Sequence, residues 1–203
     1  MTCKSRSAVL VIITITCICW IGMSTPGQGQ TKKASIDIGT LFTPSGWMGS
    51  GEYERKYIEF SGADRTYPHA QPTSFRVSYT LEAKHWGGIY WQNLPDNWGD
   101  KPGSDYSGKG FSKIVFWARG AGGGEVVEFK SGGIDATDKG KKFKDSFVVT
   151  IGRQTLTKDW RQYTIDLTGQ NLKSVIGGFC WVASADYNGA KQITFYLEDI
   201  KME

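Results

Sequence analysis

The stretch Ser74-Phe75-Arg76-Val77-Ser78-Tyr79-Thr80-Leu81 decides the fold class of this chain. Its large apolar side chains fall on every second residue, and polar side chains lie between them. Such alternation places the apolar set on one face of a β-strand and the polar set on the other. The stretch therefore predicts a strand that is half buried against a core.

The same pattern recurs along most of the chain. Alternation is clear at residues 161–167 and 193–197, and short apolar runs predict further strands. These runs cover residues 88–92, 113–119, 126–130, 147–151 and 178–183. Turn-forming stretches separate them, and 26 glycines beside six prolines fit a fold with many turns. We therefore predict an all-β fold, a two-sheet antiparallel β-sandwich of the jelly-roll type.

The N-terminal segment has the pattern of a secretory signal peptide. Lys4 and Arg6 precede an uncharged apolar run at residues 8–23, and small residues follow as far as Gly29. The run is short for a membrane-spanning helix, which needs about 20 residues. We expect residues 1–29 to be a signal peptide, with retention as an anchor as the alternative. Residues 30–203 should then form one secreted domain without a membrane span.

Cysteine and charge exclude several classes of function. Cys180 is the only one of the four cysteines in the predicted mature domain, so we expect a buried free thiol and no internal disulfide. The formal net charge of +4 falls by two when Lys4 and Arg6 leave, which gives no support for nucleic-acid binding. The two histidines, His69 and His85, lack the spacing of a zinc site.

Several segments resemble the jelly-roll carbohydrate-binding modules, which have a galactose-binding-like fold. The similar segments are residues 86–92, 114–120, 127–130, 156–167 and 195–200, and the resemblance runs from about Thr43 to the end. It implies a stand-alone exported module whose ligand is a polysaccharide or glycan. The terminal segment contains Glu198-Asp199 where such modules commonly carry two aspartates. The resemblance implies one structural calcium ion at Glu198 and Asp199.

A concave sheet that carries aromatic rings and planar polar groups suits a sugar. The strand period places Trp117 and Arg119 opposite the apolar side chains of their strand, and Glu128 and Lys130 likewise. We predict a single ligand surface formed by Tyr90, Gln92, Trp117, Arg119, Glu128, Lys130, Trp181 and the loop residue Trp98. Two alternatives stay open: Trp117 and Trp181 as core residues, and a cross-strand ion pair between Arg119 and Glu128.

Other residues also fit either a binding or a structural role. Trp47, like Trp98, lies in an expected loop, where a core role is the weaker explanation. Tyr187 suits the edge of a binding groove, whereas Trp160 suits a structural role at the start of a strand. The basic segment at residues 139–144 is typical of a solvated loop, and it would also suit an acidic polysaccharide or a lipid head group.

We expect a monomeric, non-catalytic binding domain. One alternative is a cell-envelope domain whose aromatic face docks another polypeptide. Another is a small glycoside hydrolase or lyase, which would need two carboxylates across the scissile bond. Glu125 with Glu128 and Glu52 with Glu54 are the pairs available, and no catalytic motif marks either pair.

Overall fold

The computed structural model describes residues 35–51 and 54–203, so the predicted signal peptide lies outside the described residues. Strands in the first half are β1 (Ile36–Asp37), β2 (Thr43–Gly49), β3 (Ile58–Asp64), β4 (Ser74–Thr80), β5 (Trp86–Gln92) and β6 (Lys113–Gly120). Those in the second half are β7 (Val126–Gly132), β8 (Val148–Thr155), β9 (Arg161–Asp166), β10 (Gly177–Ser184) and β11 (Gln192–Met202). The short helices are α1 (Ile38–Leu41), α2 (Ala185–Asn188), η1 (Glu54–Tyr57) and η2 (Thr137–Lys139).

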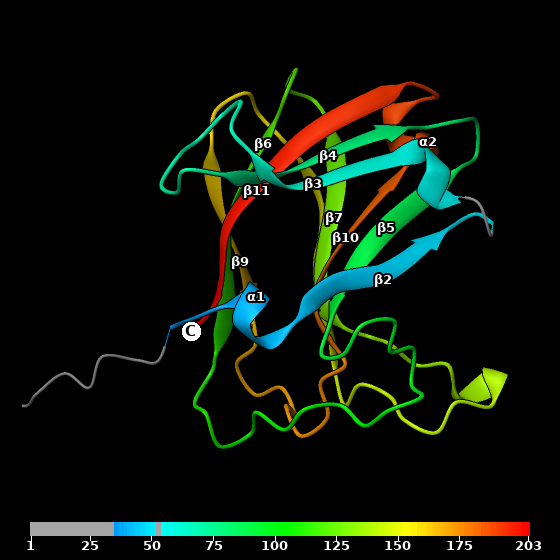
Figure 1. Cartoon of the computed structure of the whole chain (residues 1–203), viewed down its shortest axis with the longest axis vertical. Coiled ribbons are helices and arrows are strands. Elements are labelled where there is room, and N and C mark those ends of the chain that lie inside the picture. Colours follow the sequence, from blue (N-terminus) through cyan, green and yellow to red (C-terminus); the bar gives the residue numbers. More distant parts are fainter. Residues whose placement is uncertain (1–34, 52–53) are drawn as a thin grey trace, which may run out of the picture. The chain divides into compact units, whose positions relative to one another are not determined.

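The strands form two sheets (Figure 1). Sheet A has the order β3-β4-β11-β6-β9, with β1 paired to β11. Sheet B has the order β2-β5-β10-β7-β8. All these pairings are antiparallel. The prediction of an all-β, two-sheet antiparallel β-sandwich is confirmed.

Each strand expected from alternation or from an apolar run is present, with ends that differ by a few residues. Three strands were not predicted: β1, β2 and β3. Strand β2 contains Pro44, Gly46 and Gly49, which interrupt the alternation of apolar and polar side chains along the strand. Pro44 is tolerated because β2 is an edge strand of sheet B, where an absent N–H costs no ladder hydrogen bond.

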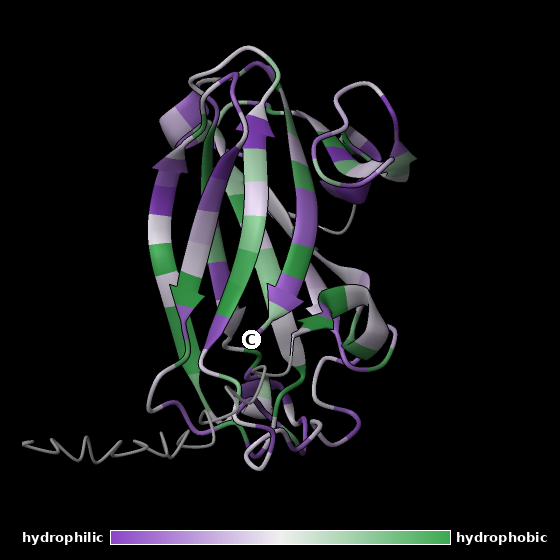
Figure 2. Ribbon diagram, turned by 90° about the vertical axis from the view of Figure 1, so that its left-hand side faces the viewer, coloured by the Kyte–Doolittle hydropathy of each residue, from purple (hydrophilic) through white to green (hydrophobic). Residues whose placement is uncertain are grey.

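The core between the sheets is aromatic. Trp91 and Phe179 from sheet B have ring centroids 5.3 Å apart, and Phe116 from sheet A lies 5.0 Å from Phe179. All three rings are fully buried. Side chains that point inward come from alternate residues of a strand. Figure 2 shows the corresponding changes of hydropathy along the strands. Within the described residues, no helix is long and apolar enough to cross a membrane.

A second, smaller apolar cluster lies on the outer side of sheet B. Its buried members are Tyr90, Ile134, Ile176 and Cys180, with Met48, Trp98, Phe143 and Val182 packed against them. Cys180 is a buried free thiol, as predicted, and burial raises its pKa. This cluster anchors the loops at residues 93–103 and 133–145 against the sheet.

Candidate functional site

The outer side of sheet B carries two adjacent rows of side chains. Strand register aligns Met48, Gly88, Val182, Glu128 and Arg153 in one row. The next row contains Gly46, Tyr90, Cys180, Lys130 and Thr150. We call these two rows the sheet B face. A Cβ atom at Gly88 would collide with the carbonyl oxygen of Trp181, so glycine is needed where the strands approach closely.

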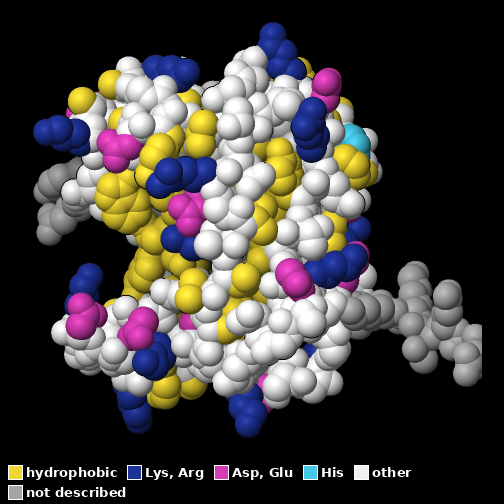
Figure 3. All heavy atoms as spheres, turned by 180° about the vertical axis from the view of Figure 1, so that it is seen from behind, with side chains coloured by type: hydrophobic (Ala, Val, Ile, Leu, Met, Phe, Trp, Pro, Cys, Tyr) yellow, Lys and Arg dark blue, Asp and Glu magenta, His cyan; other side chains and the backbone are white. Residues whose placement is uncertain are grey.

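The sheet B face is bounded at both strand ends. Loops 93–103 and 133–145 follow β5 and β7 at one end, where the Trp98 ring lies 6.1 Å from the Tyr90 ring. Helix α2 follows β10 at the other end and carries Tyr187, which is 44% exposed. The Arg153 guanidinium lies 3.4 Å from the centroid of the Tyr187 ring and donates a hydrogen bond to its hydroxyl. Figure 3 shows a hollow between two projecting ends, with hydrophobic side chains in the hollow and charged groups beside it.

Five of the eight predicted ligand residues lie on the outer side of sheet B: Tyr90, Gln92, Glu128, Lys130 and Trp98. Glu128 and Lys130 are half-buried and reach the surface. Gln92 is fully buried, donates to the Asn97 carbonyl at 2.8 Å and accepts from the Ser45 hydroxyl at 2.8 Å. Gln92 therefore holds the loop that carries Trp98, and it is not a surface group.

Tyr90 forms the floor of the face. Its side chain is 4% exposed, and its hydroxyl donates to the Gly132 carbonyl at 2.9 Å. Burial, followed by the nearby Cys180, raises the pKa of Tyr90. A neutral, hydrogen-bonded phenol supports the loop at residues 133–145 and presents little area to a ligand.

The prediction for Trp181 is wrong. Its indole is fully buried between the sheets, where its ring centroid lies 5.1 Å from that of Phe195. Alternation along β10 puts Cys180 and Val182 on the outer side and therefore Trp181 on the inner side. The alternative interpretation of Trp181 as a core residue is confirmed.

Trp117 and Arg119 do not share a surface with the other predicted residues, because β6 belongs to sheet A. Residues 65–73, which we call the strap, cover their outward side chains. The His69 ring lies 4.3 Å from the Trp117 ring, and the Arg119 guanidinium lies 3.9 Å from the centroid of the Tyr67 ring. The expectation of one continuous surface is therefore wrong. An ion pair between Arg119 and Glu128 is also ruled out, because the two residues lie in different sheets.

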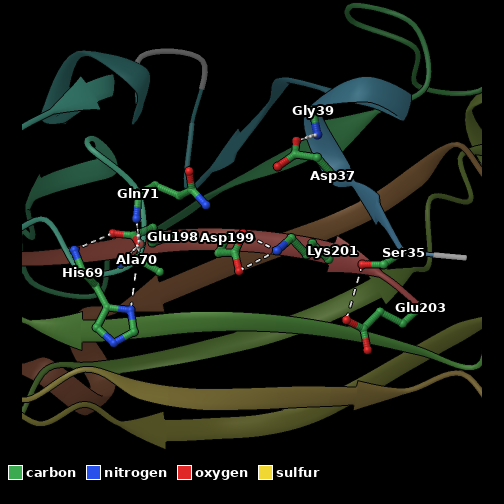
Figure 4. A network of polar contacts seen from close by, with 10 residues as sticks. All are labelled: Ser35, Asp37, Gly39, His69, Ala70, Gln71, Glu198, Asp199, Lys201 and Glu203. Carbon is green, nitrogen blue, oxygen red and sulfur yellow. Dashed lines mark hydrogen bonds and ion pairs between the residues drawn. The ribbon is translucent and has the colours of Figure 1, made fainter. Parts of the chain in front are cut away.

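The residues expected to hold calcium are already engaged (Figure 4). Glu198 is 1% exposed and accepts backbone N–H groups of His69 at 3.0 Å, Ala70 at 2.5 Å and Gln71 at 2.7 Å. Asp199 pairs with the Lys201 ammonium at 2.7 Å. In the described part of the chain, no group of three or more His, Cys, Asp or Glu side chains could hold a metal ion. These contacts do not fit calcium, which takes six to eight oxygen ligands.

A pocket of about 490 Å³ beside β2 was not predicted. We call it the tryptophan pocket; its lining is Trp47, Met48, Gly49, Gly51, Glu54, Arg55, Trp86, Trp98 and Lys139. Trp86 is 39% exposed, whereas Trp47 is half-buried and has the Arg55 guanidinium 4.6 Å from its ring centroid. Trp47 and Trp86 are 39 residues apart in the sequence, so only the pairing of β2 with β5 brings them together.

The Glu54 carboxylate in this pocket already interacts with neighbouring side chains of the protein. It is 4% exposed, accepts the Tyr79 hydroxyl, and lies 3.1 Å from Nδ1 of His85. Burial and the nearby Glu54 carboxylate raise the pKa of Tyr79. The carboxylate therefore serves the local packing of η1 against β4.

The carboxylates of Glu125 and Glu128, one of the two candidate catalytic pairs, do not face a common site. Glu125 is buried and accepts the Gly122 N–H at 2.7 Å. Glu128 lies on the sheet B face, where its carboxylate accepts the Thr150 hydroxyl at 3.2 Å. The other pair includes Glu52, which lies outside the described residues.

Asp145 ties loop 133–145 to sheet B. Its buried carboxylate accepts backbone N–H groups of Ile134 at 2.8 Å, Ile176 at 2.5 Å and Gly177 at 3.2 Å. Burial raises the pKa of Asp145 to about 6, although these three hydrogen bonds lower it. The loop that borders the sheet B face is therefore fastened by a carboxyl group that titrates in a mildly acidic range.

The stability difference between the wild type and Asp145→Asn is expected to depend on pH. Because the folded-state pKa of about 6 exceeds the ordinary 3.8, the folded protein holds the proton more tightly than the unfolded chain. This stabilisation is complete below about pH 4 and is lost as the pH rises through about 6. Relative to Asp145→Asn, the free energy of unfolding of the wild type should fall by about 3 kcal/mol as the pH rises from about 4 to above 6. Urea denaturation at several pH values measures this difference. A difference that stays constant with pH would contradict this assignment.

The fold is similar to solved structures of carbohydrate-binding modules. The family 11 module of the cellulosomal cellulase Lic26A-Cel5E of Clostridium thermocellum has a TM-score of 0.54 at 14% identity, covering 83% of this chain and 92% of that chain. The family 30 module of the cellulase Cel9D-Cel44B of the same organism has a TM-score of 0.51 at 20% identity, covering 84% and 97%. Another family 30 module has a TM-score of 0.53 at 19% identity, covering 84% and 88%.

No family model and no curated protein matches the chain. The structural likeness confirms, at the level of fold, the predicted resemblance to the jelly-roll carbohydrate-binding modules. At these identities it shows the fold alone, because one fold hosts many functions.

Proposed function

We propose that this chain is a non-catalytic carbohydrate-binding domain that holds a glycan across the sheet B face. The observation that carries the proposal is the outer side of sheet B, which has Trp98 at one end and Tyr187 at the other. Sugar rings stack on such aromatic side chains, and their hydroxyl groups need polar hydrogen-bonding partners. Glu128, Lys130 and Arg153 supply these partners between the two edges.

The same geometry favours binding over catalysis. Glycoside hydrolysis needs two carboxylates that flank one bond. Glu128 reaches the sheet B face, whereas Glu125 is buried and engaged by a backbone N–H. We further propose that the domain is exported, on the basis of the signal-peptide pattern at residues 1–29.

Substitution of the edge aromatics should weaken glycan binding without unfolding the domain. Trp98→Ala and Tyr187→Ala each remove a ring that would stack on a sugar, so the Kd should rise about tenfold. Hits from a glycan array, followed by titration calorimetry, supply the measurement. Trp160→Ala is the matched control, since its ring lies beside His69, which belongs to the strap over sheet A.

Three results would contradict the proposal. One is a loss of binding in Trp160→Ala that equals the loss in Trp98→Ala. Another is a blank glycan array together with specific capture of an envelope protein, which would favour a docking domain. The third is release of reducing ends from a polysaccharide, lost in Glu128→Gln, which would identify an enzyme.

A further inference from the structure

We propose that the tryptophan pocket is a subsite for a sugar with an anionic substituent, a carboxylate or a sulfate, so that the ligand is an acidic glycan. This inference rests on the proposed function, because it extends the sheet B face by one subsite. Met48 belongs to both the face and the pocket, and Trp98 borders both. A glycan bound on the sheet B face could therefore extend directly into the tryptophan pocket.

The charges of the pocket favour an anion. Arg55 and Lys139 are its two basic side chains, both are exposed, and neither forms an ion pair within residues 35–51 and 54–203. Among the described residues, Glu54 is the only acidic residue in the lining, and it is engaged by Tyr79 and His85. The described part of the lining therefore presents two basic side chains without an ion-pair partner and one carboxylate that is already engaged.

The basic segment at residues 139–144 separates into neutralised and free members. The Lys141 ammonium lies 2.6 Å from Asp100, and the Lys144 ammonium lies 3.2 Å from Asp135. Lys139 has no such partner among the described residues and is the member of the segment that lines the pocket. Lys142 also lacks an ion pair in the described part of the chain, but its ammonium lies 5.2 Å from the centroid of the Phe143 ring and does not line the pocket. Lys139 is thus the unpaired lysine that a ligand in the pocket could reach.

The aromatic lining and the volume fit a sugar residue. A volume of about 490 Å³ falls in the range of about 300–1,000 Å³ that is usual for small-molecule sites. Trp86 offers an exposed ring for stacking. Stacking on Trp47 fixes the Arg55 guanidinium by a cation–π contact, so its planar N–H groups remain available to two oxygens of one anionic group. Both recognition elements are in place before the ligand arrives.

The basic residues of the sheet B face also favour an anionic ligand. Lys130 and Arg153 form no ion pair in the part of the chain that the structure describes. Glu128 is the only carboxylate of the face. An acidic glycan would meet cations both in the pocket and along the face, whereas a neutral glycan would leave them unpaired.

The test compares three polysaccharides by affinity electrophoresis and calorimetry: polygalacturonate, a sulfated galactan and a neutral mixed-linked β-glucan. One of the two acidic polymers should bind at least about tenfold more tightly than the neutral one, and its binding should weaken with salt. Whichever acidic polymer binds better identifies the anionic group.

Variants then locate the contact. Lys139→Gln and Arg55→Gln should each weaken acidic-glycan binding about tenfold, which is typical of a lost charge-assisted hydrogen bond. Arg55→Lys should retain part of the affinity, because it keeps the charge and loses the planar group. Lys144→Gln is the matched control, since it removes the same charge from the same segment at a residue outside the pocket lining. Equal melting temperatures establish that the variants fold.

Failure of this inference can be told apart from failure of the proposed function. Binding to the neutral glucan alone overturns the acidic-glycan inference and leaves a carbohydrate-binding domain. No binding to any glycan overturns both. Equal losses in Lys139→Gln and Lys144→Gln, with no effect of Arg55→Gln, would show general charge attraction and overturn the pocket as a subsite.

Discussion

Trp181→Ala is expected to destabilise the domain by about 3–5 kcal/mol, the range for removing a large aromatic side chain from a core. The indole of Trp181 is fully buried and packs edge to face on Phe195 of the opposite sheet, with ring centroids 5.1 Å apart. Its removal would leave a cavity where the two sheets meet. Urea denaturation followed by circular dichroism measures the loss.

A control separates core packing from ligand binding. Trp86→Ala removes an indole that is 39% exposed, so it should cost much less stability than Trp181→Ala. In Trp181→Phe most of the buried area is kept, and the loss should be intermediate. The core assignment would be contradicted if Trp181→Ala folded with wild-type stability and lost glycan binding.

Glu198→Ala is expected to destabilise the domain by about 3 kcal/mol or more, because it removes the acceptor of three backbone N–H groups. Those groups belong to the strap, whose His69 ring rests on Trp117. Release of the strap should expose Trp117 and shift its fluorescence to the red. Thermal melting and tryptophan emission provide two independent measurements.

Chelation distinguishes this arrangement from a calcium site. With its carboxylates engaged by backbone N–H groups and by Lys201, the wild type should melt at the same temperature with EDTA and with added calcium. Glu198→Gln, which keeps one acceptor oxygen, should lose less stability than Glu198→Ala. A melting temperature that falls in EDTA and recovers with calcium would show that an ion binds at Glu198 and Asp199.

Most of the fold could be predicted because strand periodicity is local. Alternation located β4, β9 and β11, and short apolar runs located β5, β6, β7, β8 and β10. Strands β2 and β3 were missed where glycine, proline and small polar residues interrupt the pattern, as in Pro44-Ser45-Gly46 and Ser61-Gly62-Ala63. Their place in the sheets depends on pairing with β5 and β4, which no short window of sequence shows.

The candidate site was predicted less completely. Alternation correctly placed Glu128 and Lys130 opposite the core residues of β7, and Trp117 and Arg119 opposite those of β6. It failed at Trp181, because Phe179-Cys180-Trp181-Val182 is apolar at every residue and has no distinct face. The strap and the tryptophan pocket had no signal in the sequence, since each joins segments that are far apart along the chain.

The sequence by itself determined the fold class, the position of most strands and the inward or outward direction of side chains within an alternating strand. These properties follow from the two-residue period of extended backbone, which neighbouring residues impose on one another. Only the tertiary structure decided that β6 lies in sheet A and β7 in sheet B, and hence which outward side chains share a surface. That choice rests on hydrogen bonds between distant strands, such as β11 with β6 and β10 with β7, and no local pattern encodes it.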